Sequence, residues 1–563
     1  VGMLHVLDDL LARADAELGY ARMVDDRRRD IIGRSLYGVD VMEWAIHVAE
    51  LRLWLQLVIE TEISPYKLKL QPLLPNLSFK LRTGDSLVQE VGDMNLAMRH
   101  GDLSSDAEIA GRVNHLKGEK LKYYNNQSQY ASADELRRVE SDLFCDILEK
   151  RAAYLKQRIG DLEGWLRPQV NLFGEVTNPQ TTLDQAKLQN ELKERQAEYE
   201  QVQHAQRELE HAETVPFIWD IAFVEVFSGE QRGFDIVIGN PPYVRQEEIH
   251  DPRQNLDEVT TESKKVYKGK LARSVYSAWP QTFGSKWKLN AKSDLYIYFY
   301  FYGLSLLNEH GTFCFVTSNS WLDVGYGQDL QEFLLTRGQI RLVIDNQVRR
   351  SFASADVNTV ITLFGMVKDR ADKNPQSLSN IARFVMLRVP FEVVLSSGTW
   401  STIADISQRK TTDEWRVYVV KQNELLLNGM DTEKQVFSGD KWGGRYLRAP
   451  GIYWDILEKK SDMLVRLGDI AEVRRGFTTG ANEFFYVSKE TAFEWGIEAE
   501  FLVPAIKSPR ECNTIWLESD ADTPLYLFMC HSTREELRGT RALEYIKYGE
   551  GQGYHNRPTC RTR

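Results

Sequence analysis

The chain has 563 residues, of which 42% are hydrophobic and 27% charged, a composition typical of a water-soluble globular protein with three or four domains. The formal net charge of −11 excludes nucleic-acid binding through overall charge, so any such surface must be a local basic patch. No run of eighteen apolar residues occurs, so no membrane span is expected. The five cysteines form no C-x-x-C pair, which argues against a zinc ribbon or a disulfide framework and favours a reducing, cytoplasmic environment.

The N-terminal segment predicts a helix followed by a strand that ends in a carboxylate. Leucines on one helical face indicate a helix that runs to about residue 18. Residues 36–40 (LYGVD) have the pattern of a strand ending at Asp40, and a helical pattern over residues 42–55 follows Val41. At such a strand end in a nucleotide-binding α/β sheet, a carboxylate accepts hydrogen bonds from ribose hydroxyls. A helix N-cap is the alternative role for Asp40, and the two roles are compatible.

A second strand with a carboxylate behind it is predicted further along the chain. In residues 77–83 (LSFKLRT) the apolar side chains alternate, as a half-buried strand requires. Asp85 and Ser86 follow after a glycine. Asp85 can cap the backbone that follows it, and this is the alternative to the ligand role that the family resemblance given below implies for it.

Residues from about 103 to 215 predict a helical hairpin. Ser132 and Glu135 have the spacing of a capping box, and apolar residues continue at helical spacing to Leu166. A second helix begins near Thr182 and contains no Gly or Pro, and a loop over residues 168–180 separates the two. The hairpin is a candidate for gripping DNA or a partner or for bracing the fold, and its mixed charges favour a solvated face.

Residues 234–246 (FDIVIGNPPYVRQ) carry the most specific chemical pattern in the chain. The apolar run predicts a buried parallel strand that ends in a sharp turn at a glycine. The prolines at 241 and 242 each fix φ at about −65°, so the Asn240 amide oxygen and the Pro241 carbonyl are held in one geometry. Two such acceptors suit the hydrogens of an exocyclic amine, and the Tyr243 ring offers a flat face for a base. A rigid loop without chemistry is the alternative reading of these four letters.

This stretch resembles the catalytic motif of S-adenosylmethionine-dependent amino-group methyltransferases, above all the adenine-N6 DNA methyltransferases. Glutamine-N5 protein methyltransferases and guanine-N2 RNA methyltransferases share the motif. The residues to which the resemblance assigns catalysis are Asn240, Pro241, Pro242 and Tyr243. Those that it assigns to S-adenosylmethionine are Asp40, Val41, Asp85 and Ser86. It also implies a flipped base between Tyr243 and Phe352, with a core position as the alternative for Phe352.

The resemblance further implies a Rossmann-like α/β methyltransferase sheet with the helical hairpin inserted into it. Residues 340–345 and 357–364 are expected as its last two strands, an antiparallel pair. In this family a Gly-rich turn after the first strand receives the methionine end of the cofactor. No such turn precedes Asp40, so we expect half of the cofactor site to be missing and S-adenosylmethionine to bind poorly to this chain alone.

A basic and aromatic run extends over residues 264–292. It contains eight basic residues and no acidic one. Lysine and arginine contact phosphates and aromatic rings stack on bases, so the run predicts a local DNA surface, with a basic surface loop and packed aromatics as the alternative. The basic residues assigned to DNA here are Lys264, Lys265, Lys268, Lys270 and Arg273.

The C-terminal part resembles the target-recognition domain of single-chain restriction-modification methyltransferases, a mostly β module that reads bases in the major groove. Arg474, Arg475 and Arg557 are its expected DNA ligands. The expected methyltransferase domain consists of two parts, 1–103 and 216–365, with the helical insertion, 104–215, between them. A connecting region without clear pattern, 366–440, and a partial recognition domain, 441–563, are expected to follow.

Taken whole, the chain resembles a type IIG-like adenine-N6 DNA methyltransferase truncated at both ends. The resemblance implies double-stranded DNA as substrate, no membrane and no metal, and it leaves open an upstream nuclease domain or a partner subunit. The alternatives are an RNA or protein-glutamine methyltransferase and a non-catalytic DNA-binding subunit.

Overall fold

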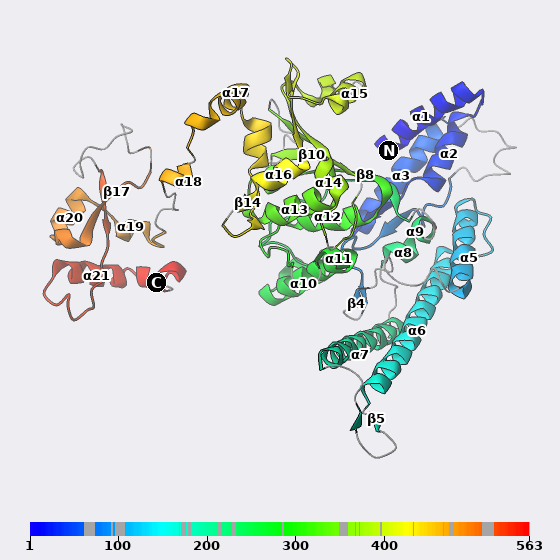
Figure 1. The fold of residues 1–563 in the computed structure, drawn as a ribbon, viewed down its shortest axis with the longest axis horizontal. Coiled ribbons are helices and arrows are strands. Elements are labelled where there is room, and N and C mark those ends of the chain that lie inside the picture. The colour runs from blue at the N-terminus through cyan, green and yellow to red at the C-terminus, as the bar shows by residue number, and fades with distance from the viewer. Residues whose placement is uncertain are drawn as a thin grey trace. The chain divides into compact units, whose positions relative to one another are not determined.

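The computed structural model shows a mixed α/β chain that divides into two compact units, residues 1–451 and residues 452–563 (Figure 1). The structure describes residues 1–60, 74–91, 94–95, 107–167, 169–170, 176–177, 182–211, 217–227, 232–283, 287–347, 358–365, 367–370, 372–394, 397–431, 433–465, 467–471, 478–508, 510 and 523–561. No helix in these ranges is both long and apolar enough to cross a membrane.

A seven-stranded mixed sheet forms the centre of the first unit. Its strands are β7 (Phe234–Gly239), β8 (Leu307–Ser318), β9 (Gln339–Asn346), β10 (Thr359–Gly365), β11 (Ile381–Leu387), β12 (Lys410–Thr411) and β13 (Trp415–Lys421). Their order is β12-β13-β11-β9-β10-β8-β7. β7 is parallel to β8, whereas β10 is antiparallel to both β8 and β9, which confirms the predicted antiparallel pair. β11 and β13, from the segment without clear pattern, extend this sheet, so β9 and β10 are not its last strands.

Helices pack on the sheet, and α12 (Leu295–Ser305) is the one rich in aromatic residues. Those between β7 and β9 are α10 (Thr261–Ala278), α11 (Pro280–Phe283), α12 and α13 (Gln328–Arg337). Those after β10 are α14 (Pro375–Ser379), α15 (Ser397–Asp405) and α16 (Gln422–Asn428). Tyr300 of α12 packs against Phe313, Phe315 and Phe364, and its hydroxyl lies 2.7 Å from Thr317 Oγ1. One part of the core of the first unit therefore lies between α12 and the central strands.

A small separate sheet contains Asp40 at the end of one strand, and Asp85 follows the end of the other. β1 (Gly38–Asp40) and β2 (Leu81–Thr83) pair in parallel, with Asp40 opposite Thr83. They pack with α1 (Gly2–Leu18), α2 (Val24–Arg34) and α3 (Glu43–Glu60) through a cluster that includes Leu4, Ile31, Leu53 and Leu81. The predicted first helix is confirmed. The predicted strand over residues 77–83 is wrong in its first half, because residues 77–80 form a turn in which the Lys80 N–H donates to the Leu77 carbonyl at 2.8 Å.

The expected single sheet is interrupted between β1 and β7. Among the described residues, β1 pairs only with β2 and β7 only with β8. As an edge strand, β7 leaves Ile236 46% and Ile238 61% exposed. The prediction that this strand is buried is therefore wrong, because its apolar run lacks a neighbour on one side within the described chain.

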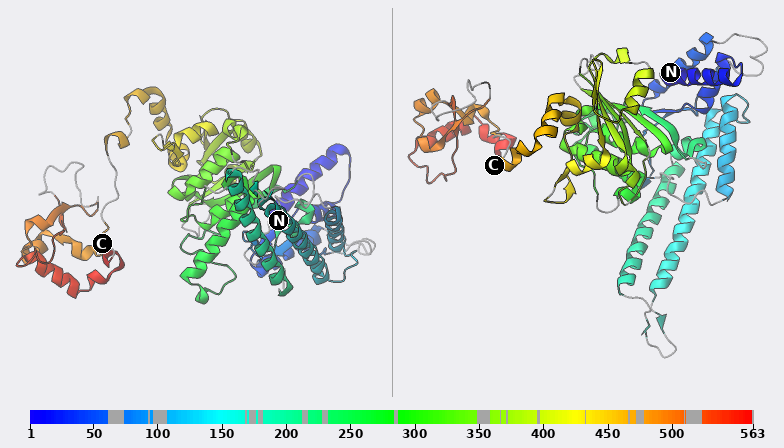
Figure 2. Two further views of the ribbon diagram at one scale, coloured as in Figure 1. Left: turned by 60° about the horizontal axis from the view of Figure 1, so that its bottom comes forward. Right: turned by 45° about the horizontal axis from the view of Figure 1, so that its top comes forward.

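The predicted helical hairpin is present and is longer at its start. Its helices are α5 (Ala107–Tyr124), α6 (Ala133–Leu166) and α7 (Thr182–His211), and both views of Figure 2 show α6 and α7 side by side. Ser132 caps α6 by accepting the Glu135 N–H at 3.2 Å, but the Glu135 carboxylate accepts from Ala131, so the capping box is only half formed. Ion pairs such as Arg158–Glu191, at 2.8 Å, join the two long helices. The predicted loop contains two short paired strands, β5 (Gln169–Val170) and β6 (Val176–Thr177).

Shorter elements complete the first unit. They are β3 (Glu90–Val91), β4 (Met94–Asn95), α8 (Trp219–Ala222), α9 (Val224–Phe227), β14 (Met430–Asp431), β15 (Val436–Phe437) and the π-helix η7 (Gly443–Arg448). α8 and α9 are buried and bring the chain back from the hairpin to β7, as expected for core residues.

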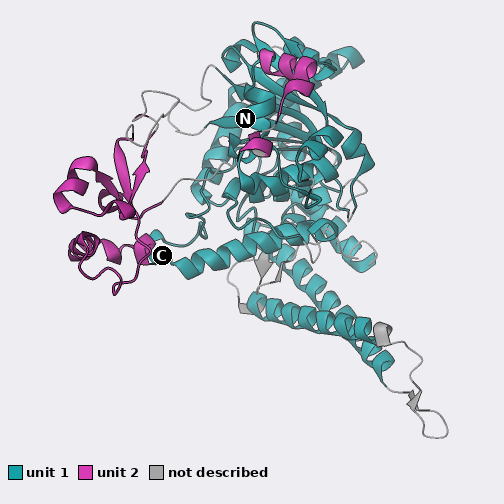
Figure 3. Ribbon diagram, turned by 60° about the vertical axis from the view of Figure 1, so that its left-hand side comes forward, with its two compact units in different colours: residues 1–451 teal, residues 452–563 magenta. Residues whose placement is uncertain are grey.

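The second unit is a small α+β body (Figure 3). β16 (Tyr486–Ser488), β18 (Leu525–Phe528) and β17 (Leu502–Ala505) form an antiparallel sheet in this order. The helices of this part of the chain are α17 (Gly451–Lys460), α18 (Leu467–Ile470), α19 (Asn482–Phe485), α20 (Lys489–Trp495), α21 (Arg541–Gly551) and α22 (Pro558–Arg561). Phe484, Phe528 and Tyr545 pack at its centre. The expectation of a mostly β module is wrong for the described residues, because the helices α19, α20 and α21 also supply core residues, such as Phe484, Ala492 and Tyr545.

Candidate functional site

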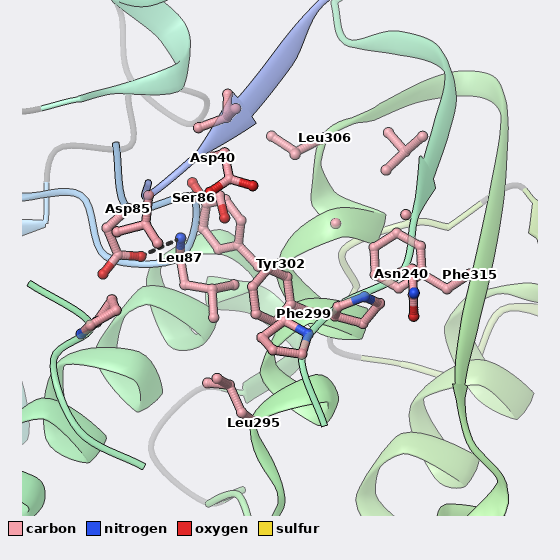
Figure 4. Close-up of a pocket in the computed structure, with 18 of the residues that line it drawn as sticks. Asp40, Asp85, Ser86, Leu87, Asn240, Leu295, Phe299, Tyr302, Leu306 and Phe315 are labelled. Carbon is pink, nitrogen blue, oxygen red and sulfur yellow. Dashed lines mark hydrogen bonds between the residues drawn. The ribbon is translucent and has the colours of Figure 1, made fainter. Parts of the chain in front are cut away.

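A cavity of about 730 Å³ opens where β1, β2 and β7 reach their carboxyl ends. The residues predicted for chemistry or cofactor binding that line it are Asp40, Val41, Asp85, Ser86, Asn240, Pro241 and Pro242. Figure 4 shows Asp40 and Asp85 on one side and Asn240 on the other, with Phe299 and Tyr302 between them. The structure thus brings together residues that are 200 positions apart in the chain, because the carboxyl ends of β1 and β7 face one space.

Asn240 begins a loop, residues 240–246, that we call the acceptor loop. It follows Gly239, at which a Cβ would lie 2.9 Å from Phe315 Cε1, so a larger residue would displace that ring. The Tyr243 hydroxyl donates to Asn240 Oδ1 at 2.9 Å and lies 3.3 Å from the Val316 carbonyl oxygen. Burial raises the pKa of Tyr243, which keeps this hydroxyl protonated. Because an amide oxygen has two lone pairs, Asn240 Oδ1 retains one acceptor position for a ligand.

The two prolines differ in their surroundings. Pro241 is buried, whereas Pro242 is exposed. The Pro242 carbonyl accepts the Val244 N–H at 3.0 Å, and no donor from the described part of the chain reaches the Pro241 carbonyl. The acceptor loop therefore presents two oxygens with acceptor capacity, Asn240 Oδ1 and the Pro241 carbonyl, beside one cavity.

Asp40 is exposed at the tip of β1. Its Oδ1 accepts the Met42 N–H at 2.8 Å, just before α3. No other donor within the described ranges reaches this carboxylate, which has about four acceptor positions. The predicted capping role is thus present, and most of the carboxylate remains open to the cavity.

Asp85 is only 8% exposed and is surrounded by donors. Its Oδ1 accepts the N–H groups of Leu87 at 2.9 Å and Val88 at 3.0 Å, as the capping alternative predicted. Its Oδ2 accepts the hydroxyl of Tyr267, from α10, at 2.7 Å. Burial and the neighbouring carboxylate raise the pKa of Tyr267, so it remains a donor. Asp85 is therefore held in place by three bonds.

The aromatic lining of the cavity was not predicted from the sequence. The cavity is lined by Leu295, Phe299 and Tyr302 of α12, by Leu306, which follows this helix, and by Trp219. The Trp219 indole N–H donates to the Ser86 carbonyl at 3.0 Å, so the loop that carries Asp85 rests on this ring. A run such as YIYFYFY indicates a buried helix but not which of its rings faces a ligand.

Two of the basic residues predicted to contact DNA donate hydrogen bonds within the protein, one to the acceptor loop and one to Glu247, which follows it. Lys268 Nζ donates to Gln246 Oε1 at 2.9 Å, and Lys264 Nζ donates to the Glu247 carbonyl at 3.0 Å. Burial lowers the pKa of Lys268. The aromatics Tyr267, Trp279 and Phe283 are 4%, 4% and 1% exposed, which favours the alternative that they are core residues. Contacts to DNA from the exposed Lys265 and Arg273, and from Lys270, stay predictions.

The remaining predicted residues lie elsewhere. Phe352, Arg474 and Arg475 fall outside the described residues. Arg557, in the second unit, pairs with Glu483 at 2.5 Å between Nη2 and Oε1, and its assignment to DNA stays a prediction. Within the described ranges, no group of three or more His, Cys, Asp or Glu side chains is arranged to hold a metal ion.

Curated relatives of the chain are type II restriction-modification proteins. The chain is 20% identical over 343 residues to the type II methyltransferase M.AccI of Acinetobacter calcoaceticus, covering 59% of this chain and 52% of that protein. It is 23% identical over 276 residues to M.BstVI of Geobacillus stearothermophilus, covering 48% and 40%. A putative type II restriction enzyme and methyltransferase of Methanocaldococcus jannaschii is 28% identical over 242 residues, 38% of this chain and 18% of that protein. The chain thus spans about half or less of each relative.

Among solved structures, the type IIG restriction endonuclease BpuSI matches with a TM-score of 0.30 and 16% identity, over 76% of this chain and 49% of that one. The type IIL enzyme MmeI, solved with DNA, matches with a TM-score of 0.30 and 12% identity, over 60% and 35%. These TM-scores are too low to support a structural argument, so the assignment depends on sequence.

Two family models match the sequence. The model of the M.Eco57I C-terminal domain, from a type II methyltransferase, covers residues 441–563. The model described as Eco57I restriction-modification methylase covers residues 34–352, which is more than half of the chain and includes both carboxylates and the acceptor loop. The chain therefore belongs to the Eco57I restriction-modification methylase family.

Proposed function

We propose that this protein transfers a methyl group from S-adenosyl-L-methionine to the N6 amine of adenine in double-stranded DNA, as the modification activity of a restriction-modification system. One observation carries the proposal. The Asn240 amide and the Asp40 carboxylate line the same cavity, so an amine acceptor and a ribose acceptor lie in one space. The parallel pairing of β1 with β2 and of β7 with β8 supports a Rossmann-like arrangement around that space.

The cavity suits the ribose and adenine of the cofactor in size and in donor set. A volume of about 730 Å³ is within the range of small-molecule sites. Asp40 has free acceptor positions for ribose hydroxyls, and Val41 lies beside it. Asp85 and Ser86, next to the rings of Phe299 and Tyr302, would hold the adenine. When bound, the cofactor supplies an electrophilic methyl group on a sulfonium.

The acceptor loop supplies what an exocyclic amine needs in order to react. The amine lone pair is delocalised into the base, and hydrogen bonds from its two N–H groups to Asn240 Oδ1 and the Pro241 carbonyl return it to the nitrogen. Positive charge would develop on the nitrogen as it bonds to the methyl carbon and the carbon–sulfur bond of the sulfonium breaks, and the two oxygens would stabilise this charge until the nitrogen loses one proton to solvent. Because these oxygens are fixed before the base arrives, little reorganisation is needed during the reaction.

An adenine within a duplex cannot reach this loop, so the proposal includes base flipping. Tyr243 and Phe352 are proposed to stack on the extruded base. The basic residues proposed to contact the DNA are Lys264, Lys265, Lys268, Lys270, Arg273, Arg474, Arg475 and Arg557. Recognition of the sequence around the target adenine is proposed for residues 441–563.

The proposal is tested by offering duplex DNA, tRNA and a protein extract to the protein with methyl-labelled S-adenosylmethionine. We expect label in the DNA alone, recovered as N6-methyladenine after digestion. Label in tRNA or in protein would show that the substrate is not DNA as we propose, but RNA or protein. Binding of DNA without label in any of the three, while equilibrium dialysis shows cofactor bound, would instead favour a non-catalytic DNA-binding subunit.

A further inference from the structure

The acceptor loop is fixed at both of its ends. At its start, Gly239 pairs with Phe315 in the parallel ladder of β7 and β8. At its end, the Val244 carbonyl accepts the Leu295 N–H at 3.1 Å, and Asp294 Oδ1 accepts the Gln246 N–H at 2.9 Å. The motif of Asn240, two prolines and Tyr243 is thus a short bridge between β7 and the start of α12. Its geometry depends on both supports.

The side chain of Asp294 binds the acceptor loop and does not cap its own helix, α12. It occupies the N-cap position of α12, yet its side chain makes no capping bond to that helix. Its Oδ1 accepts from Gln246, and its Oδ2 accepts the hydroxyl of Tyr326 at 2.8 Å. The hydroxyls of Tyr326 and Tyr296 lie 3.0 Å apart, so the carboxylate is itself held by a chain of tyrosines. A carboxylate at a helix N-terminus is also electrostatically favoured.

Lys268, on α10, binds the side chain of Gln246. Its Nζ donates to Gln246 Oε1, while Asp294 accepts from the backbone of Gln246. Gln246 therefore has its backbone bound by the start of α12 and its side chain bound by α10. These two hydrogen bonds together restrict the loop more than either one alone, because each limits the movement of Gln246 that the other allows.

We propose that Asp294 is a positioning residue for methyl transfer, which holds the acceptor loop so that Asn240 Oδ1 and the Pro241 carbonyl meet the amine hydrogens. It acts through residues 244–246 and touches neither base nor cofactor. Lys268 assists it from α10. This inference rests on the proposed function, and it gives Lys268 an intramolecular role beside the proposed phosphate contact.

The direct test compares Asp294→Ala with Asp294→Asn in the full-length protein. In Asp294→Ala the Gln246 N–H loses its acceptor, and we expect the single-turnover rate of methyl transfer to adenine to fall on the order of 10- to 100-fold, as small misplacements of reacting groups do. The dissociation constants for DNA and for S-adenosylmethionine should stay within about 2-fold, because no ligand contact is removed. In Asp294→Asn an amide oxygen replaces the acceptor, so the rate should return to within about 3-fold of the wild type.

Asp329→Ala is the matched control. Asp329 lies in the first turn of α13, and its carboxylate accepts the Trp287 indole N–H at 3.1 Å and the Asn290 N–H at 2.7 Å. It thus also joins a helix start to a preceding segment, but it does not line the cavity. We expect a loss of thermal stability similar to that of Asp294→Ala with an unchanged transfer rate.

Hydrogen–deuterium exchange of the peptide over residues 240–247 gives a second measurement that needs no activity. Exchange should be about 10-fold faster in Asp294→Ala than in the wild type and unchanged in Asp329→Ala. The inference is overturned by an unchanged transfer rate in Asp294→Ala, by equal slowing in Asp329→Ala, or by failure of Asp294→Asn to recover. If the wild type makes no N6-methyladenine, the proposed function is refuted instead. In that case, unchanged exchange of residues 240–247 in Asp294→Ala would also show that Asp294 does not restrain the acceptor loop.

Discussion

The two sides of the cavity are built for different tasks. On the carboxylate side, Asp40 has one backbone partner and an open surface, while Asp85 is buried under three donors. On the other side, the acceptor loop is tied to β8 by Tyr243 and to α12 by Asp294, and Asn240 keeps a free lone pair. Acceptor positions stay open at Asp40 and Asn240, whereas the protein's own donors occupy those of Asp85 and Asp294. Substitutions on the two sides should therefore change different quantities.

Asn240→Ala tests the acceptor side most strongly. Loss of the amide oxygen removes one of the two groups proposed to stabilise the developing charge, so we expect the transfer rate to fall at least about 10²–10³-fold. Affinity for DNA should change little, because the flipped base keeps its other contacts. Single-turnover kinetics with a DNA binding titration measure both quantities. Asn255→Ala, at an exposed asparagine outside the cavity lining, is the control and should transfer at the wild-type rate. An unimpaired Asn240→Ala would remove the chemical role from the loop.

Asp40→Ala tests the open carboxylate. Hydrogen bonds to a charged group contribute about 1.5–3 kcal/mol, so the dissociation constant for S-adenosylmethionine should rise about 10- to 100-fold. The melting temperature should hardly change, since only the Met42 N–H loses its partner. Equilibrium dialysis and thermal unfolding separate the two effects. A large loss of stability with unchanged affinity would assign Asp40 to capping alone.

Tyr267→Phe tests the filled carboxylate. The substitution keeps the ring but removes the donor to Asp85 Oδ2, which leaves a buried acceptor unpaired. We expect the free energy of unfolding to fall by about 1–3 kcal/mol and the affinity for S-adenosylmethionine to fall less than in Asp40→Ala. Chemical denaturation and dialysis measure these quantities. If Tyr267→Phe weakened the cofactor more than Asp40→Ala did, the roles given to the two carboxylates would have to be exchanged.

Tyr243→Phe should have the smallest effect of the four. It keeps the ring proposed to stack on the base and removes only the hydroxyl that holds Asn240 Oδ1. One neutral hydrogen bond contributes about 0.5–1.5 kcal/mol, so the transfer rate should fall about 2- to 10-fold. Stopped-flow or quench kinetics at saturating DNA measure it. A loss as large as that of Asn240→Ala would mean that the hydroxyl itself touches the reacting amine.

Much of the cavity followed from local pattern. Asp40 and Asn240 each follow a short apolar strand directly, so the sequence shows both the strand and the polar group at its end. The partner of Asp85 was hidden because Tyr267 lies 182 residues further along the chain. The hold on Gln246 by Asp294 was hidden for the same reason. Pairing between distant residues leaves no periodic pattern in either segment.

The fold was predicted unevenly. The long helices α6 and α7 were visible because their apolar residues recur over many turns. β11 and β13 were missed because each is a seven-residue strand whose burial depends on a sheet built by other parts of the chain. The exposure of β7 was missed because an apolar run shows what a strand prefers but not whether a neighbour covers it.

In the proposed function, the cavity joins an amine acceptor at Asn240 to a cofactor carboxylate at Asp40. Nucleoside mass spectrometry of one duplex substrate, after incubation with wild type, Asn240→Ala or Asp40→Ala at low and at saturating S-adenosylmethionine, tests it most directly. We predict N6-methyladenine with the wild type at both concentrations, with Asp40→Ala only at saturation, and with Asn240→Ala at neither. Equal N6-methyladenine from all three proteins, or a methyl group on another base, would contradict this proposal.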